Sequence, residues 1–325
     1  MTTLLPLLAV LVLLASSTAA RADFILGLAN LDSGTSVAGP YLIDVDSTTG
    51  AYSNPRLLGS SQVLNIATSP SGELFGSSLG FNTNQLFRID PALGATNLVG
   101  NIGLSPIIEG DIAFDPLNGQ LYGLQYIPDT ATGYERYLFT IDTVSGAGTI
   151  VGDLSVPDYS DLNAMAFDRA GRLFVLDSYR GFGPDRLFEV DPATARILRT
   201  VSIDYSRVEE AGVFSTLGYV GGMLFLPSDG RLYVSDSFSG TRNLYTLDTE
   251  SGLLDLVGPT GIRRYSNGGI LSLTLQPTAN PPSANPVPAP PSVVVFGVAM
   301  AAGVVWSRVR RRRIVPGTSP SSDVG

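Results

Sequence analysis

The stretch LFRIDPALGATNLVG, Leu86 to Gly100, decides the fold because it returns in four related copies. The copies are YLIDVDSTTG (Tyr41–Gly50), YLFTIDTVSGAGTIVG (Tyr137–Gly152), RLFEVDPATA (Arg186–Ala195) and NLYTLDTESGLLDLVG (Asn243–Gly258). A recurrence at a period of about 50 residues is typical of a repeat architecture. Each copy predicts a short strand and a turn that begins at an aspartate, and most copies continue into a second short apolar strand.

A second motif alternates with the first and predicts two further strands around a tight glycine turn. Its copies are IATSPSGELFG (Ile66–Gly76), IAFDPLNGQLYG (Ile112–Gly123), MAFDRAGRLFVL (Met165–Leu176) and LFLPSDGRLYVS (Leu224–Ser235). The two motifs together give four antiparallel strands per period. Four-stranded sheets repeated around an axis form a β-propeller, so we predict an all-β fold of this kind.

The two ends of the repeat region predict how the propeller closes. Gly268–Pro277 supplies only the first strand of a unit, and Phe24–Asn30 begins at the second strand. Complementary half-repeats at both ends favour a five-bladed ring in which one blade is built from both termini, leaving no exposed edge strand at the junction. The alternative is a β-solenoid, which would not need complementary halves.

Composition excludes several kinds of chemistry. The chain has no cysteine and no histidine, so disulfides, Ser-His-Asp triads and histidine-ligated zinc are ruled out. All 20 basic residues are arginine, and Asp23–Val287 carries 28 acidic residues against 14 arginines. So acidic a surface repels phosphates, which argues against a nucleic-acid partner.

The segments outside the repeats predict export. Residues 1–22 are expected to form a signal peptide with an apolar core and an Ala20-Arg21-Ala22 cleavage site, the alternative being an uncleaved anchor. The propeller is predicted for residues 23–277, followed by a proline-rich linker at 278–291. Residues 292–307 predict one short transmembrane helix, and the basic tail at 308–325 marks its cytoplasmic side.

Five aspartates fall in register within the first motif: Asp46, Asp90, Asp142, Asp191 and Asp248. Glycine, or Ala195 in one copy, follows each of them after four residues. A ring of carboxylates that binds calcium is one interpretation. We favour a second one, in which each aspartate caps its own turn and the glycine adopts a positive φ. The Asp44–Asp46 pair is a weak hint of a calcium loop, because such a loop needs several more oxygen ligands.

The connections between motifs are longer than the turns within them, so one face of the propeller should carry elaborated loops, where binding usually resides. Aromatic and arginine side chains on these loops would suit a sugar or a peptide, the alternative being plain solvated loops. The candidate ligand-binding residues are Tyr126, Tyr134, Arg136, Tyr159, Tyr179, Arg180, Tyr205, Arg207, Arg264 and Tyr265. The candidate metal ligands, where the innermost strands begin, are Glu109, Asp111 and Asp161, with Asn65 and Asn163 nearby.

The C-terminal region resembles a PEP-CTERM sorting signal, which consists of a short proline motif, an apolar helix and an arginine cluster. The matching residues are Val287, Pro288, Ala289 and Pro290, then Val293–Trp306, then Arg308 and Arg310, Arg311, Arg312 and Arg313. Ala289 stands where the family usually has glutamate. The resemblance implies an exosortase-like membrane protease as partner and export linked to extracellular polysaccharide; the alternative is an ordinary tail anchor. The repeat region separately resembles secreted quinoprotein-like or lactonase-like propellers.

These observations predict an exported, cell-surface or extracellular propeller that is first anchored in the inner membrane and serves as a binding or structural module without a cofactor. The rival hypothesis is an enzyme, a lactonase-like hydrolase that uses carboxylates at the channel mouth to hold Ca²⁺ and polarise a carbonyl. Without histidine, its general base would have to be a carboxylate.

Overall fold

A computed structural model describes residues 24–31, 39–78, 84–104, 110–129, 133–156, 162–178, 185–212, 217, 220–237, 242–262 and 269–277. Side chains are described in these ranges except at 126–129 and 133–135. Chain contacts divide the protein into Met1–Ala284 and Asn285–Gly325, and every described residue belongs to the first unit. The predicted signal peptide, linker, transmembrane helix and basic tail lie outside the described residues.

Twenty strands and one short helix make up the described chain. In order they are β1 (Phe24–Leu31), β2 (Gly39–Asp46), β3 (Tyr52–Leu57), β4 (Asn65–Thr68), β5 (Leu74–Ser78), β6 (Gln85–Ile89), β7 (Thr96–Asn101), β8 (Ile112–Phe114), β9 (Leu121–Asp129), β10 (Gly133–Ile141), β11 (Gly148–Asp153), β12 (Leu162–Phe167), β13 (Leu173–Asp177), β14 (Arg186–Val190), β15 (Ile197–Ser202), α1 (Ser206–Glu210), β16 (Val220–Phe225), β17 (Leu232–Asp236), β18 (Asn243–Leu247), β19 (Leu254–Pro259) and β20 (Gly269–Leu275). No helix in the described part of the chain is long and apolar enough to cross a membrane.

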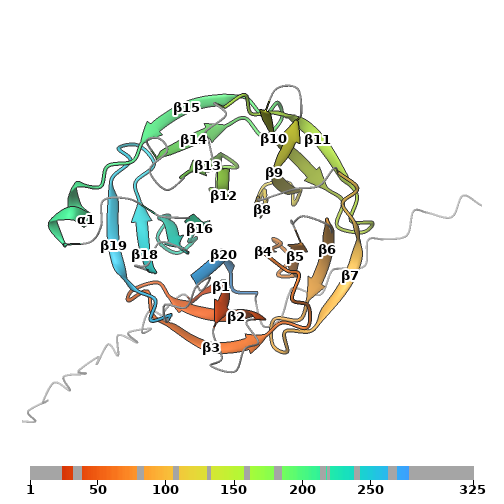
Figure 1. The fold of residues 1–325 in the computed structure, drawn as a ribbon, viewed down its shortest axis with the longest axis horizontal. Helices are drawn as coiled ribbons and strands as arrows, with labels where there is room; N and C mark the ends of the chain where they lie inside the picture. The colour runs from red at the N-terminus through yellow and green to blue at the C-terminus, as the bar shows by residue number, and fades with distance from the viewer. Residues whose placement is uncertain are drawn as a thin grey trace, which may run out of the picture. The chain divides into compact units, whose positions relative to one another are not determined.

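The strands form five antiparallel sheets of four, arranged as the blades of a propeller (Figure 1). Blade 1 has the order β20-β1-β2-β3, and blades 2 to 5 are β4–β7, β8–β11, β12–β15 and β16–β19. The innermost strands β20, β4, β8, β12 and β16 surround the axis, and the outermost strands run along the rim (Figure 1). The all-β, five-bladed prediction is confirmed.

The predicted closure of the ring is also confirmed. β20 pairs antiparallel with β1, with Ile25 opposite Leu275 and Gly27 opposite Leu273. The last strand of the repeat region therefore completes the blade that the first strand begins. A hydroxyl contact then links this blade to blade 2, since the Thr68 hydroxyl donates to the Leu275 carbonyl oxygen at 2.6 Å.

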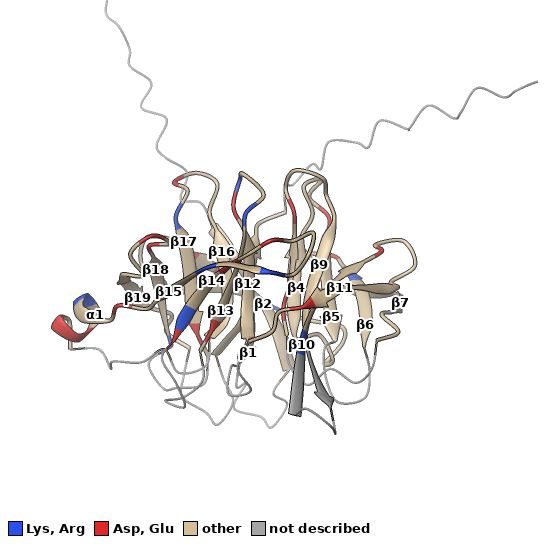
Figure 2. Cartoon of the chain, turned by 90° about the horizontal axis from the view of Figure 1, so that it is seen from above, with Lys and Arg blue, Asp and Glu red and all other residues tan. Residues whose placement is uncertain are grey.

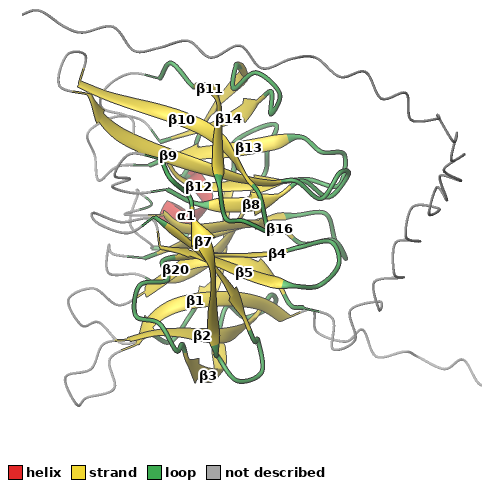
Figure 3. Cartoon of the chain, turned by 90° about the vertical axis from the view of Figure 1, so that its right-hand side faces the viewer, coloured by secondary structure: helices red, strands yellow, loops and turns green. Residues whose placement is uncertain are grey.

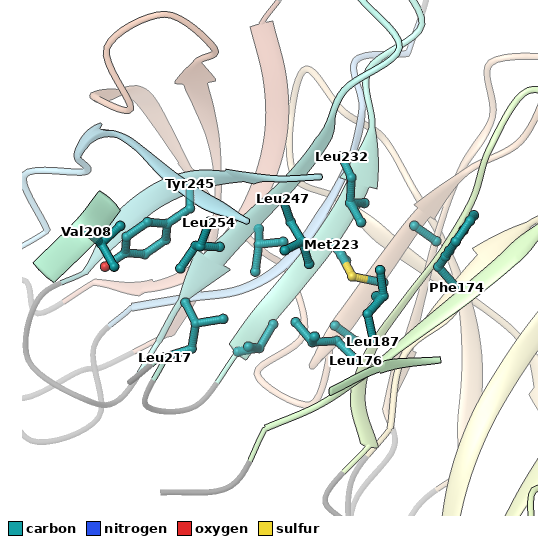
Figure 4. Packing of buried hydrophobic residues seen from close by; sticks show 14 residues of the cluster. Phe174, Leu176, Leu187, Val208, Leu217, Met223, Leu232, Tyr245, Leu247 and Leu254 are labelled. Carbon is teal, nitrogen blue, oxygen red and sulfur yellow. The ribbon is translucent and has the colours of Figure 1, made fainter. Parts of the chain in front are cut away.

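The blades pack through apolar side chains on both of their faces, as the leucines and aromatics on alternate positions predict. The middle strands β5, β13 and β17 are buried at every position, whereas the outermost strand β7 is largely exposed. Figure 4 shows one cluster of buried apolar side chains between blades, in which Leu187 of blade 4 lies close to Met223 of blade 5. Burying a side chain of this size contributes about 1.5–3 kcal/mol.

Three aromatic pairs repeat at successive blade interfaces. The second-strand aromatic of one blade contacts the phenylalanine that ends the innermost strand of the next blade. The ring centroids are 5.6 Å apart for Phe75–Phe114, 5.2 Å for Tyr122–Phe167 and 5.3 Å for Phe174–Phe225. The aromatic residue in the sequences ELFG, QLYG and RLFV thus belongs to a strand within one blade and also contacts the next blade.

At the rim, the residue four positions after each register aspartate, glycine in four blades and Ala195 in blade 4, lies against the outermost strand of the preceding blade. A Cβ atom on Gly94 would come within 2.3 Å of the Leu57 carbonyl oxygen, and one on Gly252 within 2.0 Å of the Ser202 carbonyl oxygen. The remaining pairs are Gly50 with Gly258, Gly146 with Gly100, and Ala195 with Gly152. Backbone therefore meets backbone at all five interfaces, which a side chain at most of these positions would prevent.

Candidate functional site

The two ends of the propeller axis are formed by different connections between strands. The turns between the first and second strands of the blades gather at one end, seen on the right in Figure 3. The described strand ends that the longer connections join lie at the other end. Of the candidate ligand-binding residues, Tyr159, Tyr179, Arg180, Arg264 and Tyr265 lie outside the described residues. Tyr126 and Tyr134 lie in β9 and β10, and their side chains are not described.

Arg136 lies inside the blade wall. It is opposite Tyr126 in the β9–β10 ladder, its side chain is only 2% exposed, and its carbonyl oxygen accepts a 2.8 Å hydrogen bond from the Leu154 amide. Because Arg136 is buried, its side chain is not available for direct contact with a ligand.

Tyr205 and Arg207 flank the start of α1 and are engaged within the protein. The Tyr205 hydroxyl donates to the Asp185 carboxylate and accepts a 3.2 Å hydrogen bond from the Leu217 amide. Burial and the neighbouring Asp185 raise the pKa of Tyr205 above its usual range. Arg207 is exposed and pairs with Asp255 at 2.9 Å, and this hydrogen bond raises the pKa of Arg207.

Of the three candidate metal ligands, only Asp111 is described, and it serves the packing of the axis. The Ile112 amide donates to Asp111 Oδ1 at 2.9 Å, and the Met165 amide of blade 4 donates to Oδ2 at 3.0 Å. Ser272 of blade 1 donates to Asp111 Oδ1 at 3.4 Å and also contacts the backbone of Ile66 in blade 2. Asp111 and Ser272 therefore connect the innermost strands of four blades.

Burial raises the pKa of Asp111 to about 8, although its hydrogen bonds favour the charged form. The burial that raises this pKa also disfavours the charged form that metal binding requires. Nearby, Asn65 and Asn163 are also buried, and Asn163 donates to the Ser178 carbonyl oxygen at 3.4 Å. Among the described residues, no three acidic side chains are grouped so that they could hold a metal ion.

Asp44, one of the two aspartates considered as a calcium loop, is bound by donors from the protein itself. Arg56 lies 2.5 Å from its carboxylate, Gln276 donates at 2.7 Å and Asn54 at 3.0 Å. These contacts join β2 to β3 and to the chain just beyond β20. Asp44 therefore stabilises the blade that closes the ring.

The turn interpretation of the five register aspartates is confirmed. Asp90 Oδ1 accepts hydrogen bonds from the Ala92 and Leu93 amides at 2.8 and 3.0 Å, and the Asp90 carbonyl oxygen accepts one from the Gly94 amide at 2.8 Å. The turns at Asp46, Asp142 and Asp248 repeat this pattern, and in the turn at Asp191 the Ala193 amide donates to Oδ1 while the Thr194 hydroxyl donates to Oδ2. The residues four positions on have positive φ, including Ala195 at 58°.

The hydrogen bonds within these turns also lower the pKa values of four of the aspartates. The pKa of Asp142 is lowered chiefly by the Ser145 amide, and that of Asp191 chiefly by the Thr194 hydroxyl. The pKa values of Asp46 and Asp248 are lowered by equivalent bonds from Thr48 and Ser251. Each of these carboxylates is thus held in its charged form by donors of its own turn.

The sequence did not predict a cavity of about 140 Å³ on the axis at the turn end. Its walls are mostly apolar and include Phe114, Phe167 and Phe225, which end three of the innermost strands. Pro70, Pro116 and Pro227 line the cavity within the following turns. A proline two residues after the end of β4, β8 and β16 was the available signal, but only the ring brings the three prolines together.

A wider groove of about 1090 Å³ follows the turns of blade 5. It is lined by Asp229, Arg231 and Tyr233, together with Ser47 and Thr48 from blade 1. The Tyr233 hydroxyl donates to Asp229 Oδ2 at 2.9 Å. Burial, followed by this bond, raises the pKa of Tyr233 to about 12, so the phenol stays protonated at neutral pH and cannot act there as a base.

No protein-family model matches the chain, and no curated protein matches it. Among solved structures it is similar to a protein of unknown function from Dyadobacter fermentans, with 12% identity, 77% of this chain and 86% of the other covered, and a TM-score of 0.46. TolB from Acinetobacter baumannii has 16% identity, coverages of 73% and 53%, and a TM-score of 0.44. The periplasmic gluconolactonase of Pseudomonas aeruginosa has 14% identity, coverages of 74% and 70%, and a TM-score of 0.39. Likeness at this level transfers no activity to the chain.

Proposed function

We propose that this chain is an exported β-propeller of the cell envelope that serves as a binding or structural module, with its ligand contacts on the loop end. The proposal rests chiefly on Asp111. Both of its carboxyl oxygens accept backbone hydrogen bonds, and burial raises its pKa. Asp111, the one candidate metal ligand among the described residues, thus helps to hold the innermost strands of four blades together.

The rival hydrolase would need Asp111 to leave these partners. Stripping two amides from a buried carboxylate would leave unsatisfied donors, at about 1–3 kcal/mol each. The turn aspartates and Asp44 are likewise engaged by protein donors. Glu109 and Asp161 lie outside the described residues. The enzyme hypothesis therefore now requires a metal site at the loop end that uses these two residues.

The ligand class follows from the loop composition. Tyrosines offer flat faces for stacking on sugar rings, and arginines offer charge-assisted hydrogen bonds to hydroxyl or carboxylate groups. Together with the predicted signal peptide and the resemblance of the C-terminus to a PEP-CTERM signal, this favours extracellular polysaccharide as ligand and an exosortase-like protease as processing partner.

A retention experiment tests the proposal. The purified full chain and a Tyr179→Ala/Arg180→Ala variant are passed over a column of the producing cell's extracellular polysaccharide, and their thermal unfolding is compared. We expect the variant to lose retention with a Tm shift below about 2 °C, because the sequence predicts both residues on a solvated loop, where substitutions change stability little. Arg136 is left intact because its side chain is buried.

A matched control changes exposed residues at the turn end, Leu117→Ala with Arg231→Ala. Retention of this control alongside loss in the loop variant supports the proposal. Equal retention of all three proteins would contradict the loop placement. Stoichiometric calcium in the purified chain, measured by mass spectrometry of the elements, would favour the hydrolase.

A further inference from the structure

One position of the repeat lies beside the axial cavity and is occupied differently in blade 4. In four blades the second residue after the innermost strand is proline, at Pro70, Pro116, Pro227 and Pro277. Blade 4 has Arg169 at this position, two residues after the end of β12. Arg169 lines the cavity together with the first three of these prolines. A set of otherwise apolar positions around the axis therefore contains one cation.

The charge of Arg169 is not neutralised by a neighbour in the fold. Its side chain is exposed and forms no ion pair with any residue that the structure describes. The adjacent Asp168 pairs with Arg172 instead, whose Nε donates to Asp168 Oδ2 at 2.7 Å and whose amide donates to Oδ1 at 2.9 Å. Figure 2 shows acidic and basic residues on the turns at this end of the propeller. Unpaired arginines are common on surfaces, but this one borders an apolar cavity.

The cavity has room for one ring or a short aliphatic chain. Its volume of about 140 Å³ is close to the roughly 150 Å³ of an engineered apolar cavity that binds benzene. Three phenylalanines line it, Phe114, Phe167 and Phe225. The threonine hydroxyls in the wall are engaged with backbone, since Thr68 donates to the Leu275 carbonyl oxygen at 2.6 Å and Thr274 accepts from the Thr68 amide at 2.8 Å. Arg169 is thus the group that would orient a polar ligand here.

We propose that this cavity binds a small organic monoanion, whose apolar body lies among the phenylalanines and whose carboxylate pairs with Arg169. The planar guanidinium group matches a carboxylate through two parallel hydrogen bonds. Arg169 is the only basic residue among those that the structure shows lining the cavity. One cation on a propeller with a large acidic excess favours a ligand with a single negative charge. The site lies at the turn end and is independent of the polysaccharide contacts proposed for the loop end.

Isothermal titration calorimetry of the full chain in a mild detergent tests the site with three probes. Phenylacetate has both the ring and the charge, phenylacetamide has the same shape without the charge, and acetate has the charge without the ring. We expect one phenylacetate per chain with a dissociation constant of about 0.1–1 mM, because a ligand of so few atoms binds weakly. Phenylacetamide should bind at least about tenfold more weakly, since hydrogen bonds between charged groups are the stronger ones. Acetate should give no measurable binding.

Two variants separate the charge from the cavity. Arg169→Gln should weaken phenylacetate binding at least about tenfold and change phenylacetamide binding less than about twofold. The matched control is Arg231→Gln, which makes the same change at an exposed position of the turn end that does not line the cavity. This control should bind like the parent protein. Ala113→Leu, which adds volume to the cavity wall, should abolish the binding of both probes.

Several results would overturn the proposal. One is the absence of phenylacetate binding up to about 10 mM, well above the range expected for a ligand of this size. Another is equal affinity of the parent and Arg169→Gln, a comparison at an exposed position that decides the question even if Ala113→Leu does not fold. Equal binding of phenylacetate and phenylacetamide would show that the cavity accepts uncharged apolar groups, such as a side chain of another protein. Unaltered binding by a folded Ala113→Leu variant would place the ligand outside the cavity.

Discussion

The rim and the axis of this propeller achieve the same thing, contact between neighbouring blades, by different means. At the rim every interface uses one solution, a positive-φ turn residue against the backbone of the preceding blade. At the axis each innermost strand differs: β8 follows Asp111, β20 carries Ser272, and β16 carries Gly221 and Gly222. A Cβ atom on Gly221 would come within 1.6 Å of the Ile270 carbonyl oxygen, so two innermost strands there are in direct backbone contact.

The difference teaches where repetition is needed. The rim faces an identical geometric problem five times, so the motif repeats. The axis is a single place where five strands converge, and identical side chains could not all occupy it. Asymmetry at the axis is therefore a packing necessity, and the hydrogen bonds of Asp111 to blades 4 and 1 are part of it.

The largest expected effect comes from removing an axial strand. Deleting Gly269–Leu275 from the full chain leaves the edge of β1 unpaired and removes the Ser272 and Thr274 contacts to blade 2. We expect loss of the cooperative melting transition, because the closure holds the ends of the ring together. Deleting the predicted tail 314–325 is the control. A deletion variant that melts like the parent would show that blade 1 does not close the ring.

The next effect distinguishes rim contacts from turn conformation. Gly94→Ala should lower the free energy of unfolding by about 3 kcal/mol, since it combines a left-handed backbone cost of about 1–2 kcal/mol with a clash against Leu57. Gly119→Ala has the same φ sign with open space around it and should cost only about 1 kcal/mol. Urea unfolding measures both, and equal losses would mean that the rim contact contributes nothing.

Asp111 at the axis should make the free energy of unfolding depend on pH. The folded pKa of Asp111, about 8, lies above an unfolded value of about 3.9, so folding favours the protonated form. Stability from this group is fully present below pH 4 and is lost as pH rises through 8, at up to about 1.4 kcal/mol per pH unit.

Urea unfolding between pH 5 and 8 should therefore give a falling free energy in the parent protein and a flatter profile in Asp111→Asn. The variant should also be less stable at pH 5, because its amide nitrogen would face a backbone donor. Asp255→Asn, which removes an exposed carboxylate, is the control and should keep the parent's slope. An unchanged slope in Asp111→Asn would locate the titrating group elsewhere.

The smallest expected effect is at the one rim turn without glycine. Ala195 holds a φ of 58° while its methyl group is fully buried near Gly152. Ala195→Gly should relieve about 1 kcal/mol of backbone strain and lose about 0.8 kcal/mol of methyl burial. We expect a net change within about 0.5 kcal/mol by urea unfolding. A loss above about 1.5 kcal/mol would show that the methyl contact governs this turn.

The sequence by itself determined the blade. Strand alternation, the aspartate that begins each turn and the glycine four residues later are local features, and half-repeats such as Phe24–Asn30 imply closure because an unpaired edge is unfavourable. The five blades and the capped turns could therefore be predicted from the sequence, and both are confirmed.

The tertiary structure alone decided what the axis contains. Asp111 and Met165 are 54 residues apart, and Asp111 and Ser272 are 161 apart, so no local pattern brings them together. The same holds for the proline-lined cavity and for the burial of Arg136, which the sequence placed among surface loop residues. Closing five strands around one axis joins residues that are distant in the chain, and only that closure buries Asp111 among hydrogen bonds from two other blades.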